Sequence, residues 1–137
     1  MLFPKKTKFK KLKKGRIKKG LEYKSNQLKF GTYGIKALEC GYITARQIEA
    51  VRRTITSSMN RTGKVWIRIF PDYPVTAKPV EVRMGRGKGN VQYWACKIKT
   101  GKVLYEVAGK NPFLIQSALQ KAANKLPLLT KIIGPIV

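Results

Sequence analysis

Three closely spaced glycines constrain the fold of this chain more than any other feature of its sequence. Gly85, Gly87 and Gly89 alternate with basic side chains, and apolar, strand-like runs flank the segment on both sides. Glycine has no Cβ and tolerates positive φ, so the backbone can bend sharply here and approach another surface closely. We therefore predict a glycine-rich loop at residues 84–90, and we expect the fold to survive alanine at all three glycines.

The charge of this glycine loop indicates an anionic partner. No acidic residue lies between Glu81 and Glu106, so the loop cations have no opposite charge nearby in the sequence. The whole chain has 30 lysine and arginine residues against 6 acidic ones, a formal net charge of +24. Such self-repulsion destabilises a compact chain unless a polyanion neutralises it, and nucleic acid supplies regular phosphate charge. A solvated basic surface and an anionic membrane are the alternatives, but the densest charge run lacks the broad apolar face of an interfacial helix.

Residues 1–27 are predicted to form a basic arm, followed by a single globular domain at residues 28–137. No acidic residue precedes Glu22, and the apolar residues of the arm are spaced too thinly to bury a face. We expect the arm to be disordered alone and to become ordered along a track of phosphates. A targeting peptide is the alternative, but the arm has lysine where a transit peptide favours arginine and serine. The candidate RNA-binding residues of the arm are Lys5, Lys6, Lys8, Lys10, Lys11, Lys13, Lys14 and Arg16, and Lys18 and Lys19 continue the run.

Capping signals and apolar spacing predict two helices. The first begins after Thr44, which forms a capping-box pattern with Gln47, and ends within Asn60–Gly63. The second begins after Asn111, an N-cap followed by proline, and ends before Pro127. The residues expected to be buried are Ile48, Val51, Ile55 and Met59 in the first helix, and Ile115, Ala118, Leu119, Ala122 and Leu126 in the second.

Short apolar, β-branched and aromatic runs predict the strands. They lie at residues 28–40 (a bent strand or strand pair ended by Gly41), 64–70, 80–84, 91–99, 102–107 and 128–133. Prolines between residues 71 and 79 predict an extended, turn-rich connection, and Thr100-Gly101 predicts a tight turn. Because strands and helices alternate without repeated βαβ units, we predict an α+β fold. In this two-layer sandwich both helices pack on one mainly antiparallel sheet.

The sequence offers little for catalysis, metal binding or membrane insertion. It has no histidine, one aspartate and five scattered glutamates, whereas acid–base chemistry usually needs two convergent groups. The glycine spacing matches neither the dinucleotide fingerprint nor a phosphate-binding P-loop. Cys40 and Cys96 are expected to be buried, reduced thiols rather than zinc ligands. We therefore predict no enzymatic activity, no cofactor, no metal site and no transmembrane segment.

Nucleic-acid binding is supported at other places as well. Arg46, Arg53 and Arg61 are predicted to give a rigid basic surface around the first helix. Near these elements, Tyr73, Tyr93 and Trp94 could stack on unpaired bases, with core packing as the alternative for Trp94. No signature of a base-reading module is present, which favours recognition of RNA shape in a large assembled particle. An RNA- or DNA-binding architectural protein outside such a particle is the alternative.

Several long motifs, in the same order, resemble the ribosomal protein L-sixteen family. The motifs occupy residues 2–9, 44–50, 63–72, 82–90, 93–94, 101–106 and 123–127. The resemblance implies two helices against an antiparallel sheet and a structural role in the large ribosomal subunit. It also implies contact with the ribosomal RNA (rRNA) that forms the aminoacyl-tRNA site, a contribution to tRNA placement, and late entry into subunit assembly.

The resemblance also implies a role for the glycine loop. In the family this loop points toward the peptidyl-transferase region and the acceptor end of the tRNA. The residues that take this role here are Arg83, Met84, Gly85, Arg86, Gly87, Lys88, Gly89 and Asn90. Some bacterial relatives hydroxylate the position of Arg83. The implied partners are large-subunit rRNA, aminoacyl-site tRNA and neighbouring ribosomal proteins, without membrane insertion or homo-oligomer formation.

Two departures from the family pattern bear on contacts and source. Lys18–Gln27 differs in length and composition, and Ala108–Ser117 lacks the acidic residues that usual members have before the last helix. The second departure suggests a partner that bacteria lack. Enrichment in lysine and isoleucine fits an AT-rich genome, and the resemblance starts at residue 1 without a cleavable presequence. We therefore expect an organelle-encoded protein of the mitochondrial matrix, with the bacterial cytoplasm or a plastid as alternatives.

Overall fold

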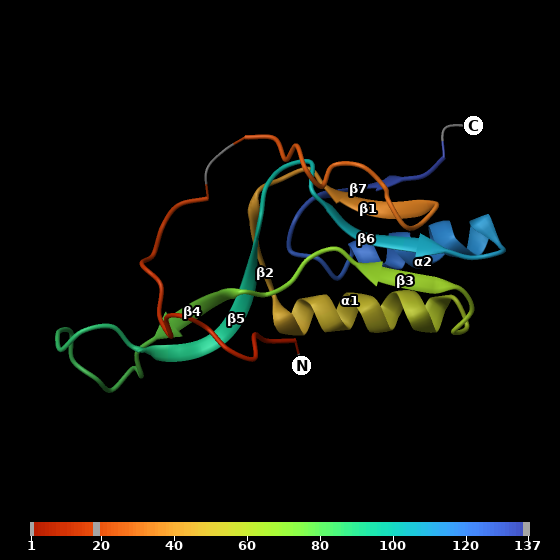
Figure 1. Ribbon diagram of the computed structural model, residues 1–137. Coiled ribbons are helices and arrows are strands. Elements are labelled where there is room, and N and C mark those ends of the chain that lie inside the picture. The colour runs from red at the N-terminus through yellow and green to blue at the C-terminus, as the bar shows by residue number, and fades with distance from the viewer. Residues whose placement is uncertain (1, 18–19, 136–137) are drawn as a thin grey trace.

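The computed structural model describes residues 2–17 and 20–135 of the chain. These residues contain two helices and seven strands, and the strands form two antiparallel sheets (Figure 1). The α+β class is therefore confirmed. The expectation of one sheet needs a correction, because the strands divide into a four-stranded and a three-stranded sheet.

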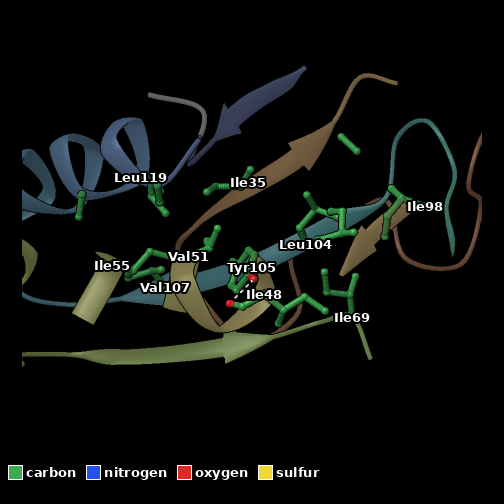
Figure 2. Close-up of a cluster of buried hydrophobic side chains, with 14 of the residues drawn as sticks. Ile35, Ile48, Val51, Ile55, Ile69, Ile98, Leu104, Tyr105, Val107 and Leu119 are labelled. Carbon is green, nitrogen blue, oxygen red and sulfur yellow. Dashed lines mark hydrogen bonds between the residues drawn. The ribbon is translucent and has the colours of Figure 1, made fainter. Parts of the chain in front are cut away.

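The four-stranded sheet and the two helices form the apolar core. Its strands are, in spatial order, β3 (Lys64–Ile67), β6 (Val103–Ala108), β1 (Tyr33–Ala37) and β7 (Thr130–Ile133). The helices α1 (Ala45–Ser58) and α2 (Pro112–Ala123) contact each other and this sheet. The resulting cluster of fully buried aliphatic side chains surrounds the ring of Tyr105 (Figure 2). The Tyr105 hydroxyl donates a hydrogen bond to the Ile48 carbonyl at 2.9 Å, and burial raises the pKa of this phenol.

The three-stranded sheet extends away from the helices. Its order is β2 (Gly41–Thr44), β5 (Asn90–Ile98) and β4 (Tyr73–Ala77). The chain crosses between the two sheets four times: from β1 to β2, from β2 through α1 to β3, from β3 to β4, and from β5 to β6. Figure 1 shows that the far end of this sheet carries the β4–β5 connection, which contains the glycine loop. The sheet thus holds the loop at a distance from the core.

Both predicted helix starts are confirmed. The Thr44 hydroxyl accepts a hydrogen bond from the Gln47 amide, and the Gln47 side chain accepts one from the Thr44 amide, which completes the capping box. The Asn111 side chain accepts bonds from two backbone amides of the first turn of α2. All nine predicted stripe residues are buried except Leu126, which is half-buried and packs against the core. The first helix ends as predicted, because Asn60 and Arg61 take left-handed φ angles.

Three strand predictions need correction. Residues 80–84 form no strand, because the β4–β5 loop leaves this stretch exposed and without a partner strand. The missed strand is β4, which lies inside the predicted proline-rich connection. Pro74 fits there because β4 is an edge strand, where one side of the backbone needs no N–H donor. Gly41 begins β2 instead of ending the preceding strand.

The predicted arm is partly attached to the rest of the chain. Residues 2–17 contain no helix or strand, and most of their side chains are exposed. Residues 21–25 contact the β5–β6 turn, where the Glu22 amide donates to the Thr100 carbonyl and the Val103 amide donates to the Ser25 carbonyl. Lys18 and Lys19 lie outside the described residues. The division into an arm at 1–27 and a domain at 28–137 stays a prediction.

Candidate nucleic-acid interface

The glycine loop is locally ordered by its own backbone conformation. Gly85, Arg86 and Gly87 follow one another with φ angles of +108°, +53° and +83°. Glycine is favoured at the first and third of these positions, because a Cβ makes the left-handed region costly. A Cβ at Gly89 would instead lie 2.2 Å from the Ala77 carbonyl oxygen. Two glycines are therefore required by backbone angle and the third by close packing against β4.

The loop presents positive charge and apolar side chains together. Arg83, Arg86 and Lys88 are exposed, as is the acidic Glu81 at the start of the loop. Met84 is 97% exposed, and Val80 beside it is fully exposed. These side chains leave apolar area in water next to the loop cations, an area that a binding partner would cover.

The arm and the glycine loop are joined by reciprocal hydrogen bonds. The Lys11 ammonium donates to the Lys88 carbonyl at 3.0 Å, and the Lys88 ammonium donates to the Leu12 carbonyl. The Lys78 ammonium also donates to the Gly85 carbonyl. Figure 1 shows the arm passing beside this end of the three-stranded sheet. Cations of two segments far apart in the sequence are thus gathered, an arrangement that a bound polyanion would stabilise.

A second basic surface lies on α1. Arg46 and Arg53 are exposed, as predicted, and Glu49 lies between them on the helix. The Glu49 carboxylate accepts hydrogen bonds from Arg52 at 2.7 Å and from Arg53 at 3.1 Å. These bonds, chiefly the one from Arg52, lower the pKa of Glu49 to about 2. The carboxylate therefore stays ionised and orients both guanidinium groups.

The start of the arm lies beside the α1 surface. Leu2 lines a shallow cleft together with Arg46, Glu49, Ala50 and Arg53. The described arm then continues to its contacts with the glycine loop. The structure thus brings together three of the predicted groups: the arm, the α1 arginines and the glycine loop.

Arg61 does not join these groups. It follows the C-terminal end of α1, whereas Arg46 lies in the first turn. A helix of 14 residues is about 21 Å long, so the two arginines lie at opposite ends. Figure 1 shows that the α1–β3 connection lies on the far side of the molecule from the β4–β5 loop. Arg61 is exposed and requires a separate contact.

Sequence reasoning missed a buried ion pair between Arg68 and Glu106. The Glu106 side chain is fully buried, and one carboxylate oxygen pairs with the Arg68 guanidinium. The other oxygen accepts hydrogen bonds from the backbone amides of Lys29, Phe30 and Gly31, at 2.6–3.0 Å. The acidic residue inside the apolar run of β6 was the available signal. The Arg68 guanidinium is thus used within the fold.

The cysteine prediction is half right. Cys96 is buried, which raises the pKa of its thiol, but Cys40 is only half-buried. The described residues contain no group of three or more side chains suited to hold a metal ion. Within that same part of the chain, neither helix has the length and apolar character to cross a membrane.

Comparisons with known proteins agree on one family. The sequence model of the family described as Ribosomal protein L16p/L10e matches residues 4–133. The large ribosomal subunit protein uL16 of Gluconobacter oxydans is 57% identical over 136 residues, which cover 99% of this chain and 98% of the relative. Proteins of the same name from Psychrobacter arcticus and Acinetobacter baylyi are each 56% identical over 133 residues, covering 97% of this chain and 96% of the relative. The chain belongs to the ribosomal protein L16p/L10e family.

Proposed function

We propose that this chain is a structural component of the large ribosomal subunit and binds its rRNA. The observation that most strongly supports this proposal is the basic surface that runs from the α1 arginines along the arm to the glycine loop. Its close relatives are named as large-subunit proteins. Membership in a ribosomal protein family supports a structural role and not a catalytic one. The arm lysines, Arg16, the α1 arginines and Arg61 are the proposed rRNA contacts.

We further propose that the glycine loop helps to shape the aminoacyl-tRNA site and that the protein joins the subunit late in assembly. Two features support this role. At residues 85 and 87 the left-handed backbone is formed by glycines, which have no Cβ and let the chain approach another surface closely on either side of Arg86. The loop also projects from the molecule at the end of the three-stranded sheet (Figure 1). Loop contact with tRNA rests on the family resemblance.

The test is cosedimentation with large ribosomal subunits in increasing salt. We expect the chain to stay bound at moderate salt, because many phosphate contacts act together. The double variant R86Q/K88Q should be released at lower salt or leave subunits immature. The matched control K125Q/K131Q also removes two exposed cations, in this case two lysines of the α2–β7 region. Release of the unmodified chain at low salt, or binding to naked duplexes without preference, would support the alternative of an independent architectural protein.

The compartment is a finer question than the ribosomal role. The relatives named above are bacterial; they support a ribosomal location and agree with the bacterial alternative. They do not support the expected mitochondrial location, for which the lysine and isoleucine enrichment remains the argument. Fractionation of the source cells with an antibody against this chain decides between an organellar and a cytoplasmic ribosome.

A further inference from the structure

One face of the three-stranded sheet carries three tyrosines. In the central strand β5, Ala95 lies between Thr44 of β2 and Tyr73 of β4. Tyr42 of β2 lies opposite Lys97 of β5, and Tyr93 of β5 lies opposite Val75 of β4. Side chains alternate along a strand, so these positions share one face of the sheet. Trp94, which sequence analysis grouped with Tyr73 and Tyr93, belongs to the opposite face and is half-buried.

These tyrosines line a cavity of about 340 Å³. Tyr42 and Tyr73 lie with ring centroids 5.7 Å apart, and Tyr93 forms another part of the wall. Tyr42 and Tyr93 remain 37% and 42% exposed, so neither ring is fully used by the core. Ala95 is small and fully buried in this row, which leaves room above it for the rings. The cavity is within the size range of sites for small planar groups.

Positive charge and polar groups surround the rings. Lys14 of the arm lines the cavity, and the Lys97 ammonium, outside the lining, lies 4.0 Å from the centre of the Tyr73 ring. The Tyr42 hydroxyl donates to the Gly15 carbonyl at 3.3 Å, which holds the arm against this face. Gln47 lines the cavity as well, and its capping bonds use the side-chain oxygen and not the amide nitrogen. No acidic side chain lines the cavity.

We propose that this tyrosine cradle, formed by Tyr42, Tyr73 and Tyr93, holds an unpaired RNA base. This inference rests on the proposed rRNA binding and adds a site for a single nucleotide to it. Aromatic rings bind the face of a base, which is accessible only when the base is unstacked from its neighbours. Lys14, which lines the cavity, is the cation available to a phosphate of that nucleotide, and Lys97 adds positive charge beside the Tyr73 ring. A duplex can use these lysines but cannot place a base face on the rings.

The test compares a single strand with a duplex. The full chain is titrated with an oligouridylate strand and with the same strand annealed to oligoadenylate. Stacking on an aromatic ring contributes to the affinity for a single strand, and leucine cannot replace it. Tyr73→Leu and Tyr93→Leu should therefore each weaken single-strand binding about tenfold. Duplex affinity and the dependence of both affinities on salt should stay unchanged, because the phosphate contacts remain.

Two controls separate stacking from folding. Tyr73→Phe keeps the ring and should bind like the unmodified chain. Phe113→Leu removes an aromatic ring that is 82% exposed on α2 and should have no effect on either RNA. Thermal unfolding identifies any variant that does not fold, and Tyr93→Leu provides a second test if Tyr73→Leu fails.

The outcomes are distinct from those of the proposed function. Selective loss of single-strand binding in the leucine variants supports the cradle. Equal loss for both RNAs, or no loss for either, overturns it, even if the chain still cosediments with large subunits. Failure to cosediment while the single-strand preference persists would count against the ribosomal proposal and not against the cradle.

Discussion

The two sheets of this protein place their charges in opposite ways. The four-stranded sheet and the helices bury one carboxylate, Glu106, and satisfy it with Arg68 and three backbone amides. In the three-stranded sheet with its loop and arm, Lys11, Lys78 and Lys88 lie close together and donate hydrogen bonds to backbone carbonyls. A buried charge needs a partner within the fold, because it has no contact with water. An exposed cation is solvated by water and remains available to an external anion. The interior of the first region therefore neutralises its own buried charge, whereas the second region leaves cations available for a polyanion.

The two regions also use aromatic side chains differently. Around the four-stranded sheet, the Tyr105 ring is fully buried and its hydroxyl donates to the Ile48 carbonyl, so it serves internal packing. On the three-stranded sheet, the tyrosine rings stay partly exposed. Substitutions in the first region should therefore change stability, and substitutions in the second should change binding.

The largest expected effect follows from Glu106→Ala. The change leaves the Arg68 guanidinium buried without its carboxylate and removes the acceptor of three backbone amides. Breaking a buried ion pair from one side costs about 3–5 kcal/mol. Chemical denaturation measures this loss in the free energy of unfolding. Exposed Glu81→Ala is the control, and equal stability of the two variants would show that the buried pair does not stabilise this region.

Alanine substitutions in the glycine loop should have an intermediate effect on stability, and the effect should differ between Gly89 and Gly87. Gly89→Ala places a Cβ 2.2 Å from the Ala77 carbonyl oxygen, so β4 and β5 must shift, at a cost of about 1–3 kcal/mol. Gly87→Ala meets no atom within 4 Å and costs only local strain in the loop backbone, so β4 and β5 should keep their pairing while RNA contact weakens. Hydrogen exchange of the β4 and β5 amides measures the difference. Equal protection in both variants would contradict it.

This result would modify the expectation from the sequence that all three glycines tolerate alanine. The loop positions look alike in sequence, because each glycine precedes or follows a basic residue. Only the register of β4 and β5, which pairs Ala77 with Asn90, places the Gly89 backbone against the neighbouring strand.

The smallest effect concerns Glu49, whose pKa is lowered from 4.5 to about 2 by the bonds from Arg52 and Arg53. A depressed pKa in the folded state means that the ionised carboxylate stabilises the fold above about pH 4.5. That contribution is lost as pH falls through about 2. We expect helical circular dichroism of Glu49→Gln to change less over this interval than that of the unmodified chain. Identical acid profiles would show that the exposed pair contributes nothing measurable.

Local signals explain which elements were predictable. The Thr44–Gln47 capping box and the Asn111–Pro112 start act over three residues or fewer, so sequence alone identifies both helices. Strand β4 was missed because prolines normally exclude a strand. Its edge position, which makes Pro74 acceptable, depends on strands distant in the sequence.

The sequence by itself determined the helices, the basic excess, the glycine loop and the family, because all four depend on local order or composition. Tertiary structure alone decided three other features: the division into two sheets, the burial of Glu106 beside Arg68, and the meeting of the arm with the glycine loop. It also decided which tyrosines share a face and which arginine lies apart. The physical reason is that strand register and long-range hydrogen bonds join residues distant in the sequence, as in the bonds from Lys11 to Lys88, 77 positions apart, and from Gly31 to Glu106, 75 positions apart.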